Sequence, residues 1–446
     1  MKKQWKPWLV LLLLLCACTM TTACGDREQE HPGVNDKAEL TESEMAGPDH
    51  EMRSTLTVWV ATDIHYLSRE LYDDSPIFVK TLEQGDGKLT ERMPEILDIF
   101  VDQVLTARPD ALVLAGDLTF NGEKQSLHEL MEWMDEIRQA GIPVLVIPGN
   151  HDKGQYMAVS YLNNMLGGAE TFSEDDFQQI CGPYSYDQAV CRDESSMSYV
   201  YDLTEDVQLI LLDVNMLGDD TPYTRGSLPA STLTWLEAQL AAASAAGKTV
   251  LTVSHQNVLP QNSLLYYGYA MYNYEEVSAL LQKYGVRVNV SGHSHIQHMA
   301  QEGGLRDHAV GPLSVTPLRY GVLTIDEERN IQYESASLTE PASSDVQIIP
   351  VSEAAKELVT EAEQRYQMCQ HRRVMEMLEG IQQRQGFSDA EQEIMASFMV
   401  TINQAYVTGE MVDQNDALES EGWRLWTKYC QEDFWWQYLH DILTES

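Results

Sequence analysis

The sequence predicts an α/β domain over 55–340 and an all-helical domain over 351–446. Two patterns lead to this prediction. Up to residue 340, short apolar runs typical of buried strands alternate with helical stretches, and beyond residue 351 apolar residues recur only at helical spacing. The chain has 446 residues, of which 43% are hydrophobic and 22% charged, so it is long enough for two domains and has the composition of a globular protein that folds in water.

The first 24 residues have the features of a bacterial targeting segment. Three lysines precede an apolar run over 8–16 that is too short to cross a bilayer unaided. We expect an exported protein held at the cell surface by a lipid on Cys18 or Cys24, with cleavage to a secreted protein as the alternative. The acidic stretch 25–54 has almost no large apolar residues, so we expect it to be a disordered tether.

The charge balance restricts the partners. Against 29 Lys and Arg stand 69 Asp and Glu, a net charge of −40. Such a surface repels phosphate backbones, which excludes sequence-independent binding to long nucleic acid. It also repels anionic lipid headgroups, so we expect membrane attachment through the lipid anchor only.

The elements of the first domain follow in chain order. An apolar run of four to six residues marks each early strand, and apolar residues at helical spacing mark each helix between them. Three later short strands are expected to close the domain as a β-meander, and 341–350, with two prolines, is expected to be a linker. The expected strands are 56–61, 111–115, 143–147, 207–212, 249–253, 286–290, 308–315, 321–326 and 331–337, and the expected helices are 95–106, 124–140, 231–246 and 274–284.

The second domain is expected to be a helical bundle. Ser388 and Glu391 form a capping-box pattern that starts its second helix. A tryptophan-containing stripe could form a ligand cage, but at helical spacing it is more typical of a bundle core. The expected apolar faces are Leu358, Ala362, Tyr366 and Cys369; Ile394, Phe398, Ile402 and Tyr406; and Trp423, Trp426, Cys430 and Phe434.

Four cysteines lie outside the targeting segment: Cys181, Cys191, Cys369 and Cys430. An even number in an exported chain permits two disulfides, most simply Cys181 with Cys191 and Cys369 with Cys430. Three connectivities are possible, and buried free thiols are the alternative.

Five short motifs each follow a predicted strand, where open α/β sheets place their ligands. Imidazole and carboxylate groups suit Mn, Fe and Zn, and a carboxylate can bridge two such ions. Two ions ~3.5 to 4 Å apart can activate water and neutralise a phosphate. The motifs are Asp63-Ile64-His65, Gly116-Asp117, Gly149-Asn150-His151-Asp152, Ser254-His255 and Gly292-His293-Ser294-His295.

In order and composition these motifs resemble those of the calcineurin-like metallophosphoesterase superfamily. The resemblance implies two β-sheets packed together and flanked by helices, and two divalent metal ions. One ion would be bound by Asp63, His65, Asp117 and His295, and the other by Asp117, Asn150, His255 and His293.

The resemblance also implies that His151 is a catalytic residue rather than a metal ligand, protonating the leaving group or stabilising the transition state. Phosphoprotein phosphatases orient this histidine with an aspartate three residues after the bridging one, where this chain has Phe120. We therefore expect Asp152 or a backbone carbonyl to orient His151. Purple acid phosphatases have a tyrosine ligand at the same position, and Phe120 cannot replace it, which disfavours that branch.

The chain is more closely similar to bacterial exported cyclic nucleotide phosphodiesterase-like lipoproteins, through residues 61–67, 116–124 and 195–199 and the helical C-terminal domain. This implies hydrolysis of a small phosphodiester, such as a cyclic nucleotide, by a hydroxide that bridges the two metals. The alternatives are an extracellular phosphomonoesterase or nucleotidase, and an inactive scaffold used for binding. The long segment 66–92 between the first two motifs is either a lid or a surface insertion without contact to substrate.

Overall fold

The computed structural model describes residues 55–153, 157–215, 226–264, 266–342, 348–431 and 433–444. The expected targeting segment, the candidate lipidation sites Cys18 and Cys24, and the tether 25–54 lie outside these residues. Within the described ranges, no helix has both the length and the apolar character needed to cross a membrane.

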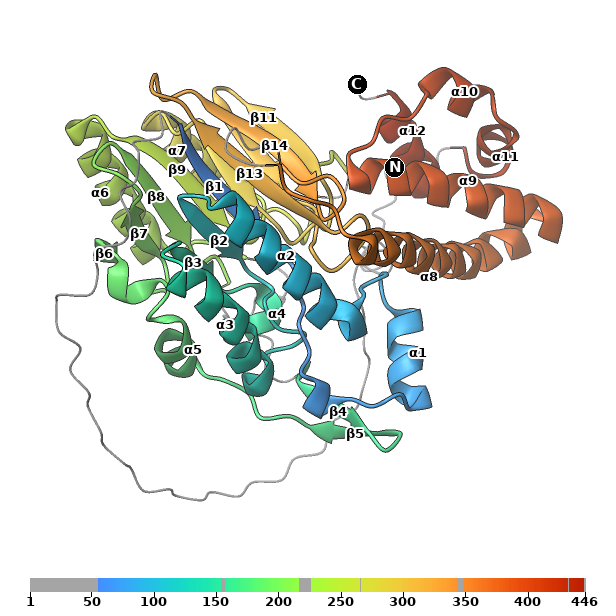
Figure 1. The fold of residues 1–446 in the computed structure, drawn as a ribbon. Helices are drawn as coiled ribbons and strands as arrows, with labels where there is room; N and C mark the ends of the chain where they lie inside the picture. The colour runs from blue at the N-terminus through green and yellow to red at the C-terminus, as the bar shows by residue number, and fades with distance from the viewer. Residues whose placement is uncertain are drawn as a thin grey trace.

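Two β-sheets packed face to face form the catalytic part, as predicted (Figure 1). The strand order is β14-β13-β1-β2-β3 in one sheet and β11-β12-β10-β9-β8-β7-β6 in the other. A small hairpin, β4 and β5, stands apart. The strands are β1 (Leu56–Ala61), β2 (Ala111–Ala115), β3 (Val144–Ile147), β4 (Val159–Leu162), β5 (Met165–Gly168), β6 (Cys191–Arg192), β7 (Tyr199–Asp202), β8 (Val207–Leu212), β9 (Thr249–Ser254), β10 (Val288–Ser291), β11 (His298–Glu302), β12 (Leu305–Ala309), β13 (Arg319–Ile325) and β14 (Ile331–Ser337).

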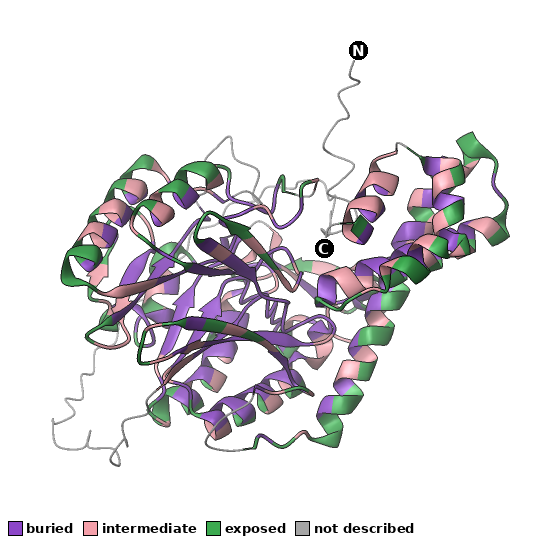
Figure 2. Ribbon diagram, turned by 90° about the horizontal axis from the view of Figure 1, so that it is seen from above, coloured by how far each residue is buried: buried purple, intermediate pink, exposed green. Residues whose placement is uncertain are grey.

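Strand β8 shows why the central strands are apolar throughout. Leu209 and Leu211 belong to the core between the sheets, whereas Ile210 and Leu212 pack with the helices outside. Successive side chains of a strand point to opposite faces, so a strand covered on both faces has no polar alternation. Figure 2 shows the result: buried residues fill the central strands, and exposed residues lie on the outer faces of the helices.

Helices cover both outer faces of the sandwich. Helices α2 and α3 pack on the first sheet, and α6 and α7 pack on the second. Segment 66–92 contributes α1 and two short 3-10 turns, η3 and η4. The bounds are η3 (Arg69–Leu71), α1 (Pro76–Gln84), η4 (Thr90–Arg92), α2 (Met93–Ala107), α3 (Lys124–Gln139), α4 (Asn150–Lys153), α5 (Glu174–Cys181), η6 (Tyr186–Gln188), α6 (Ala230–Ala246) and α7 (Tyr274–Lys283).

The prediction of a closing β-meander was wrong. Strand β12 joins the second sheet, parallel to β10 and antiparallel to β11, whereas β13 and β14 join the first sheet beside β1. Strand β11 was not predicted, because this edge strand is largely exposed and its sequence, His-Met-Ala-Gln-Glu, contains no apolar run. The late strands therefore complete both sheets.

The C-terminal segment is all-helical, as predicted. The capping box of Ser388 and Glu391 starts α9, and the indole of buried Trp426 donates a hydrogen bond to the Met395 carbonyl in the bundle core. The stripe containing Trp426 is divided between two helices, because α11 ends before Phe434. The face of α9 is also rotated from the expected one, with Met395 and Met399 buried. The helices are α8 (Glu353–Gln385), α9 (Asp389–Thr408), α10 (Gln414–Glu419), α11 (Glu421–Cys430) and α12 (Phe434–Thr444).

Helix α8 belongs to both parts of the molecule. Its first turns supply Ala355 and Leu358 to the core of the catalytic domain, and its last turns supply Leu378 and Ile381 to the core of the bundle. The four cysteines in the described ranges are free thiols, three of them buried, which is the alternative to the two disulfides. One of them, Cys369, faces the backbone of segment 66–92, with Sγ 3.3 Å from the Glu83 carbonyl.

Candidate metal centre

The five motifs meet where the parallel strands β1, β2, β3, β9 and β10 end, because carboxyl ends of parallel strands share one edge. The turns that carry the side chains are tight. Residues other than glycine seldom adopt a left-handed backbone conformation, and Asp, Asn and His tolerate it best. Residues in this conformation are often found at functional sites. Positive φ values of 49° to 65° occur at Asp63, His65, Asp117, His293 and His295.

The first group of ligand atoms consists of Asp63, His65 and His295. The two imidazole Nε2 atoms lie 3.3 Å apart, and Asp63 Oδ1 lies 3.2 Å from His295 Nε2 and 3.8 Å from His65 Nε2. Asp63 is fully buried, and its Oδ1 atom has no hydrogen-bond partner within the described residues. Convergent nitrogen and oxygen atoms around an orphaned carboxylate oxygen fit a divalent cation.

The second group consists of Asp117, Asn150, His255 and His293. His255 Nε2 lies 3.2 Å from both Asp117 Oδ2 and Asn150 Oδ1. The other nitrogen of each histidine faces a carbonyl: His255 Nδ1 lies 2.8 Å from Ala115 O, and His293 Nε2 lies 2.7 Å from Gly268 O. A ring N–H that donates to a carbonyl fixes the tautomer, so His255 Nε2 and His293 Nδ1 are the atoms free to coordinate.

Asp117 lies between the two groups. Its Oδ2 atom is 3.8 Å from His65 Nε2 and 3.2 Å from His255 Nε2, and its Oδ1 atom accepts the His151 backbone N–H at 2.8 Å. The structure thus brings all seven expected ligands together around a shared carboxylate. Their chemistry fits a pair of divalent ions. The overlapping sets are Asp63, His65 and His295; His65, Asp117 and His151; and Asp117, His255 and His293.

Two of the four histidines are neutral in the metal-free protein, and the other two are protonated. Burial lowers the pKa of His293 to about 4 and, with Lys88, holds the pKa of His65 well below its usual range, so both rings are neutral. Burial opposes protonation of His255 and His295 too, but the charges of Asp117 and Asp63 raise the pKa of each to about 9. Without metal, protonated His255 therefore balances the charge of Asp117, and protonated His295 balances the charge of Asp63.

His151 sits beside this centre. Its Nδ1 atom lies 2.8 Å from the Phe120 carbonyl and 2.9 Å from Asn121 Oδ1, and its Nε2 atom lies 4.0 Å from Asp117 Oδ2. Of the two expected partners, the structure therefore has the backbone carbonyl. The carboxylate of Asp152 instead accepts the backbone N–H groups of residues 118, 119 and 149, which ties the loop of Asp117 to that of Asn150.

Sequence reasoning missed Asp86 and Lys88, which segment 66–92 brings to the centre. Asp86 Oδ2 lies 3.3 Å from His295 Nδ1 and 2.7 Å from Lys88 Nζ. A carboxylate behind a ligand histidine fixes its orientation and raises its basicity. The one available signal was Gly85-Asp86-Gly87-Lys88, where glycines flank a charged residue. The segment is part of the site wall and not a distant insertion.

Gln256 and Asn257, which follow the ligand His255, brace the loops around it. Gln256 Nε2 donates to Asn215 Oδ1 at 2.7 Å, and Asn257 Nδ2 donates to Ser291 Oγ at 2.8 Å. Both side chains are buried. Gln256 Nε2 also lies 3.5 Å from Asn150 Oδ1, so the Gln at position 256 reaches one of the expected ligands directly as well as bracing the loops.

Two family models match this chain. The calcineurin-like phosphoesterase family matches residues 56–297, more than half of the chain. The C-terminal domain of cyclic nucleotide phosphodiesterase matches residues 360–446.

Solved structures with similar folds include two phosphatases and a putative nucleotidase. A dimetal phosphatase from Danio rerio is 14% identical, with a TM-score of 0.46, and the match covers 63% of this chain and 98% of that one. A purple acid phosphatase from yellow lupin (Lupinus luteus) seeds is 13% identical, with a TM-score of 0.40 and coverage of 65% and 53%. A putative 5′-nucleotidase from Staphylococcus aureus is 13% identical, with a TM-score of 0.37 and coverage of 70% and 58%. These values are too low to transfer a substrate.

Proposed function

The chain belongs to the calcineurin-like phosphoesterase family, and on that premise we propose that it is a phosphodiesterase whose substrate is a cyclic nucleotide. Metal-dependent hydrolysis of a phosphate ester is the family's chemistry, and the seven convergent ligands are those that two metal ions require. The choice of a diester over a monoester depends on one observation, the match of residues 360–446 to the C-terminal domain of cyclic nucleotide phosphodiesterase.

Two divalent ions bound at these ligands would supply an activated water molecule and neutralise the phosphoryl oxygens. The chain's own residues position and complement that chemistry. Asp117 places a carboxylate oxygen between the two ligand groups, and Asp86 holds His295 in orientation. Lys88, whose side chain is only 11% exposed and forms an ion pair with Asp86, lies close enough to His65 and His151 for its charge to lower the pKa of both rings.

His151 has the geometry of the residue that protonates the leaving oxygen. With Nδ1–H bound to the Phe120 carbonyl, Nε2 is the atom available for proton transfer. Burial lowers the pKa of His151, although Asp117 opposes this, so the ring is neutral in the empty site. To act as the acid, His151 must be protonated in the complex, and the negative charge of a bound phosphate ester favours that state.

The deciding experiment is a substrate panel with Mn²⁺-loaded protein: 3′,5′-cyclic nucleotides, linear diesters and monoesters. We expect the cyclic nucleotides to have the highest kcat/KM. Faster hydrolysis of 5′-nucleotides would overturn the proposal in favour of a nucleotidase, and binding without turnover would identify a scaffold that uses the site for recognition.

Asp117→Ala provides the test of the metal assignment within that panel. The substitution removes the carboxylate shared by both ligand groups, so metal content should fall below two ions per chain and turnover should collapse. Asp102→Ala, on the exposed face of α2, is the matched control. Wild-type turnover with two metals retained in Asp117→Ala would contradict the assignment.

A further inference from the structure

One fully buried carboxylate outside the ligand set, Asp307 of β12, is hydrogen-bonded to two segments that carry ligands. Its Oδ2 atom accepts the backbone N–H groups of Val258 and Leu259, at 2.7 and 2.9 Å. Its Oδ1 atom accepts the Asn289 side-chain amide at 2.8 Å and the Ser291 hydroxyl at 2.9 Å. A single carboxylate therefore joins the loop that follows β9 to the end of β10.

This carboxylate is an expensive way to stabilise a sheet. Burial raises the pKa of Asp307, and the main groups that oppose this effect are its four hydrogen-bond donors, none of which is a cation. A buried charge without a partner cation is unfavourable for folding, which points to a role beyond stability. The polar network continues into β9, where Thr252 Oγ1 donates to Asn289 Oδ1 at 2.7 Å. A buried network whose members are all satisfied makes the elements that it joins rigid.

The loop that follows β9 positions both histidines of the second ligand group. It begins with the ligand His255, directly after the strand. Farther along, it supplies the Gly268 carbonyl, which lies 2.7 Å from His293 Nε2 and fixes that ring. The two parts of the loop are joined at Asn257, whose backbone N–H donates to the Tyr269 carbonyl at 3.2 Å. A shift of this loop away from β12 would therefore displace both imidazoles.

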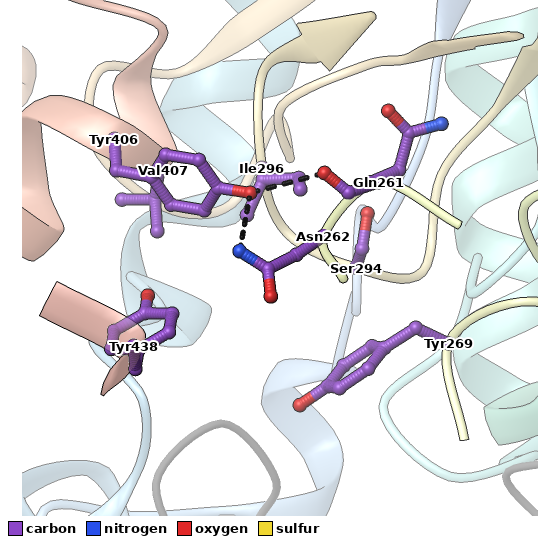
Figure 3. Close-up of a pocket in the computed structure, with 8 residues that line it drawn as sticks. All are labelled: Gln261, Asn262, Tyr269, Ser294, Ile296, Tyr406, Val407 and Tyr438. Atoms are coloured by element: carbon purple, nitrogen blue, oxygen red, sulfur yellow. Dashed lines mark hydrogen bonds between the residues drawn. The ribbon is translucent and has the colours of Figure 1, made fainter. Parts of the chain in front are cut away.

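The C-terminal helices hold the same loop at a second place. Figure 3 shows Tyr406 of α9 reaching Gln261 and Asn262: its hydroxyl donates to the Gln261 carbonyl at 3.2 Å and lies 3.4 Å from Asn262 Nδ2. The Gln261 side chain in turn donates to the backbone carbonyl of Asp307 at 3.2 Å. The loop is thus fixed to α9 and to β12, and the Asp307 carboxylate is the fixed point nearer in sequence to the ligand His255.

We propose that Asp307 is a positioning residue of the metal centre, whose carboxylate holds His255 and His293 in the arrangement that binds the second ion. The proposal rests on the proposed function for the presence of two metal ions, but not for the identity of the ester. The first ion should depend less on Asp307, because three of its four expected ligands follow β1 and β2, which belong to the other sheet.

The test is Asp307→Asn, which keeps the size of the side chain but replaces one acceptor oxygen with an NH2 group that faces two of the four donors. In a Mn²⁺ titration followed by calorimetry, we expect one site of wild-type affinity and one site weakened about 10- to 100-fold, the usual effect of residues behind metal ligands. At two ions per chain, the EPR spectrum should change from that of a coupled Mn²⁺ pair toward that of single ions.

Asp193→Asn is the matched control. Asp193 is also a buried carboxylate, 8% exposed, and it accepts hydrogen bonds from the hydroxyls of Ser195, Ser196 and Thr232. None of these three partners lies in a loop that carries an expected ligand. A purely structural loss would lower the Tm of both variants and leave both Mn²⁺ sites at wild-type affinity.

Ser291→Ala is a milder second variant, which keeps the carboxylate and removes one of its four donors. We expect a smaller loss of Mn²⁺ affinity at the same site, and this variant decides the question if Asp307→Asn does not fold. Unchanged affinity at both sites, or equal weakening of both, would overturn the role of Asp307 and leave the phosphodiesterase proposal standing. If the wild-type protein binds two ions but hydrolyses no ester, while Asp307→Asn loses one ion selectively, the proposed function fails and the role of Asp307 stands.

Discussion

His151 shows how one side chain acquires a role from its backbone surroundings. Phe120 occupies the position where related phosphatases have an orienting aspartate, and the carbonyl of that same residue orients the ring instead. The side chain at position 120 is therefore irrelevant to the hydrogen bond, which explains why the sequence alone left the partner of His151 open.

We expect His151→Ala to keep both metals and to lose a factor of ~10² to 10⁴ in kcat, the usual contribution of general acid–base catalysis. The loss should be smaller for 4-nitrophenyl esters, because nitrophenolate departs without a proton. Steady-state kinetics on esters with leaving groups of graded acidity measures the difference. A loss that is independent of leaving-group acidity would reassign His151 to binding the transition state.

The paired charges of the empty centre predict how metal binding depends on pH. His255 and His295 have pKa values of about 9, so both are protonated at neutral pH, and both must become neutral to coordinate. Metal binding should therefore release protons, and affinity should rise with pH until it passes about 9. Calorimetry in buffers of different ionisation enthalpy counts these protons, and a binding constant that stays unchanged between pH 6 and 8 would contradict the assignment.

At the scale of elements, predictability followed burial. Strands β1, β2 and β8 have the predicted bounds, because the core requires apolar runs there, and β14 has them although its middle residues are not buried. The motifs at strand ends predicted seven candidate ligands, and the structure brings these side chains together. Asp86 and Asp307 could not be predicted, because each reaches the ligands or their loops through contacts distant in the sequence.

Helix α8 is the element that positions Asp86. Gln370 Nε2 of α8 donates to the Asp86 carbonyl at 3.4 Å, Arg373 Nη2 donates to the Gln84 carbonyl at 3.3 Å, and Arg365 forms an ion pair with Glu91. The loop and the helix meet so closely at Gly87 that a larger residue there would have to push them apart. A Cβ atom on Gly87, whose φ is +106°, would lie 3.0 Å from the Tyr366 Cα.

Gly87→Ala should therefore displace the Asp86 loop from α8. We expect a loss of stability beyond the ~1 kcal/mol that a left-handed alanine costs, together with weaker metal binding, because Asp86 would no longer orient His295. Gly247→Ala is the control: its φ is +70°, but nothing lies within 4 Å of the added Cβ. Thermal unfolding measures the stability of both variants, and metal titration measures their metal affinity. Equal losses in the two variants would show that α8 does not hold the loop.

At the scale of the whole molecule, the two cores are joined where the chemistry takes place. Helix α8 is shared between the cores, and it also holds the loop of Asp86, which contacts the candidate ligand His295. In a chain with a net charge of −40, the two expected metal ions would supply positive charge at this junction, where Lys88 is paired with Asp86. Binding of a small phosphate anion is thus compatible with a surface that repels nucleic acid.

Truncation near residue 345 tests whether the C-terminal helices are part of the catalytic unit. The cut removes Leu358 and Tyr366, which are buried against the catalytic domain, and burial of each such side chain contributes ~1.5 to 3 kcal/mol. A few losses of this size approach the whole stability of a domain, ~5 to 15 kcal/mol. Because the cut also frees the Asp86 loop, we expect poor soluble yield, metal content below two ions per chain, and little activity on cyclic nucleotides. Soluble yield, metal analysis and diester kinetics measure these effects.

A truncated protein that folds, binds two metals and hydrolyses the same cyclic nucleotide at full rate would show that the helices are a separate attachment. Their role would then be more consistent with partner binding.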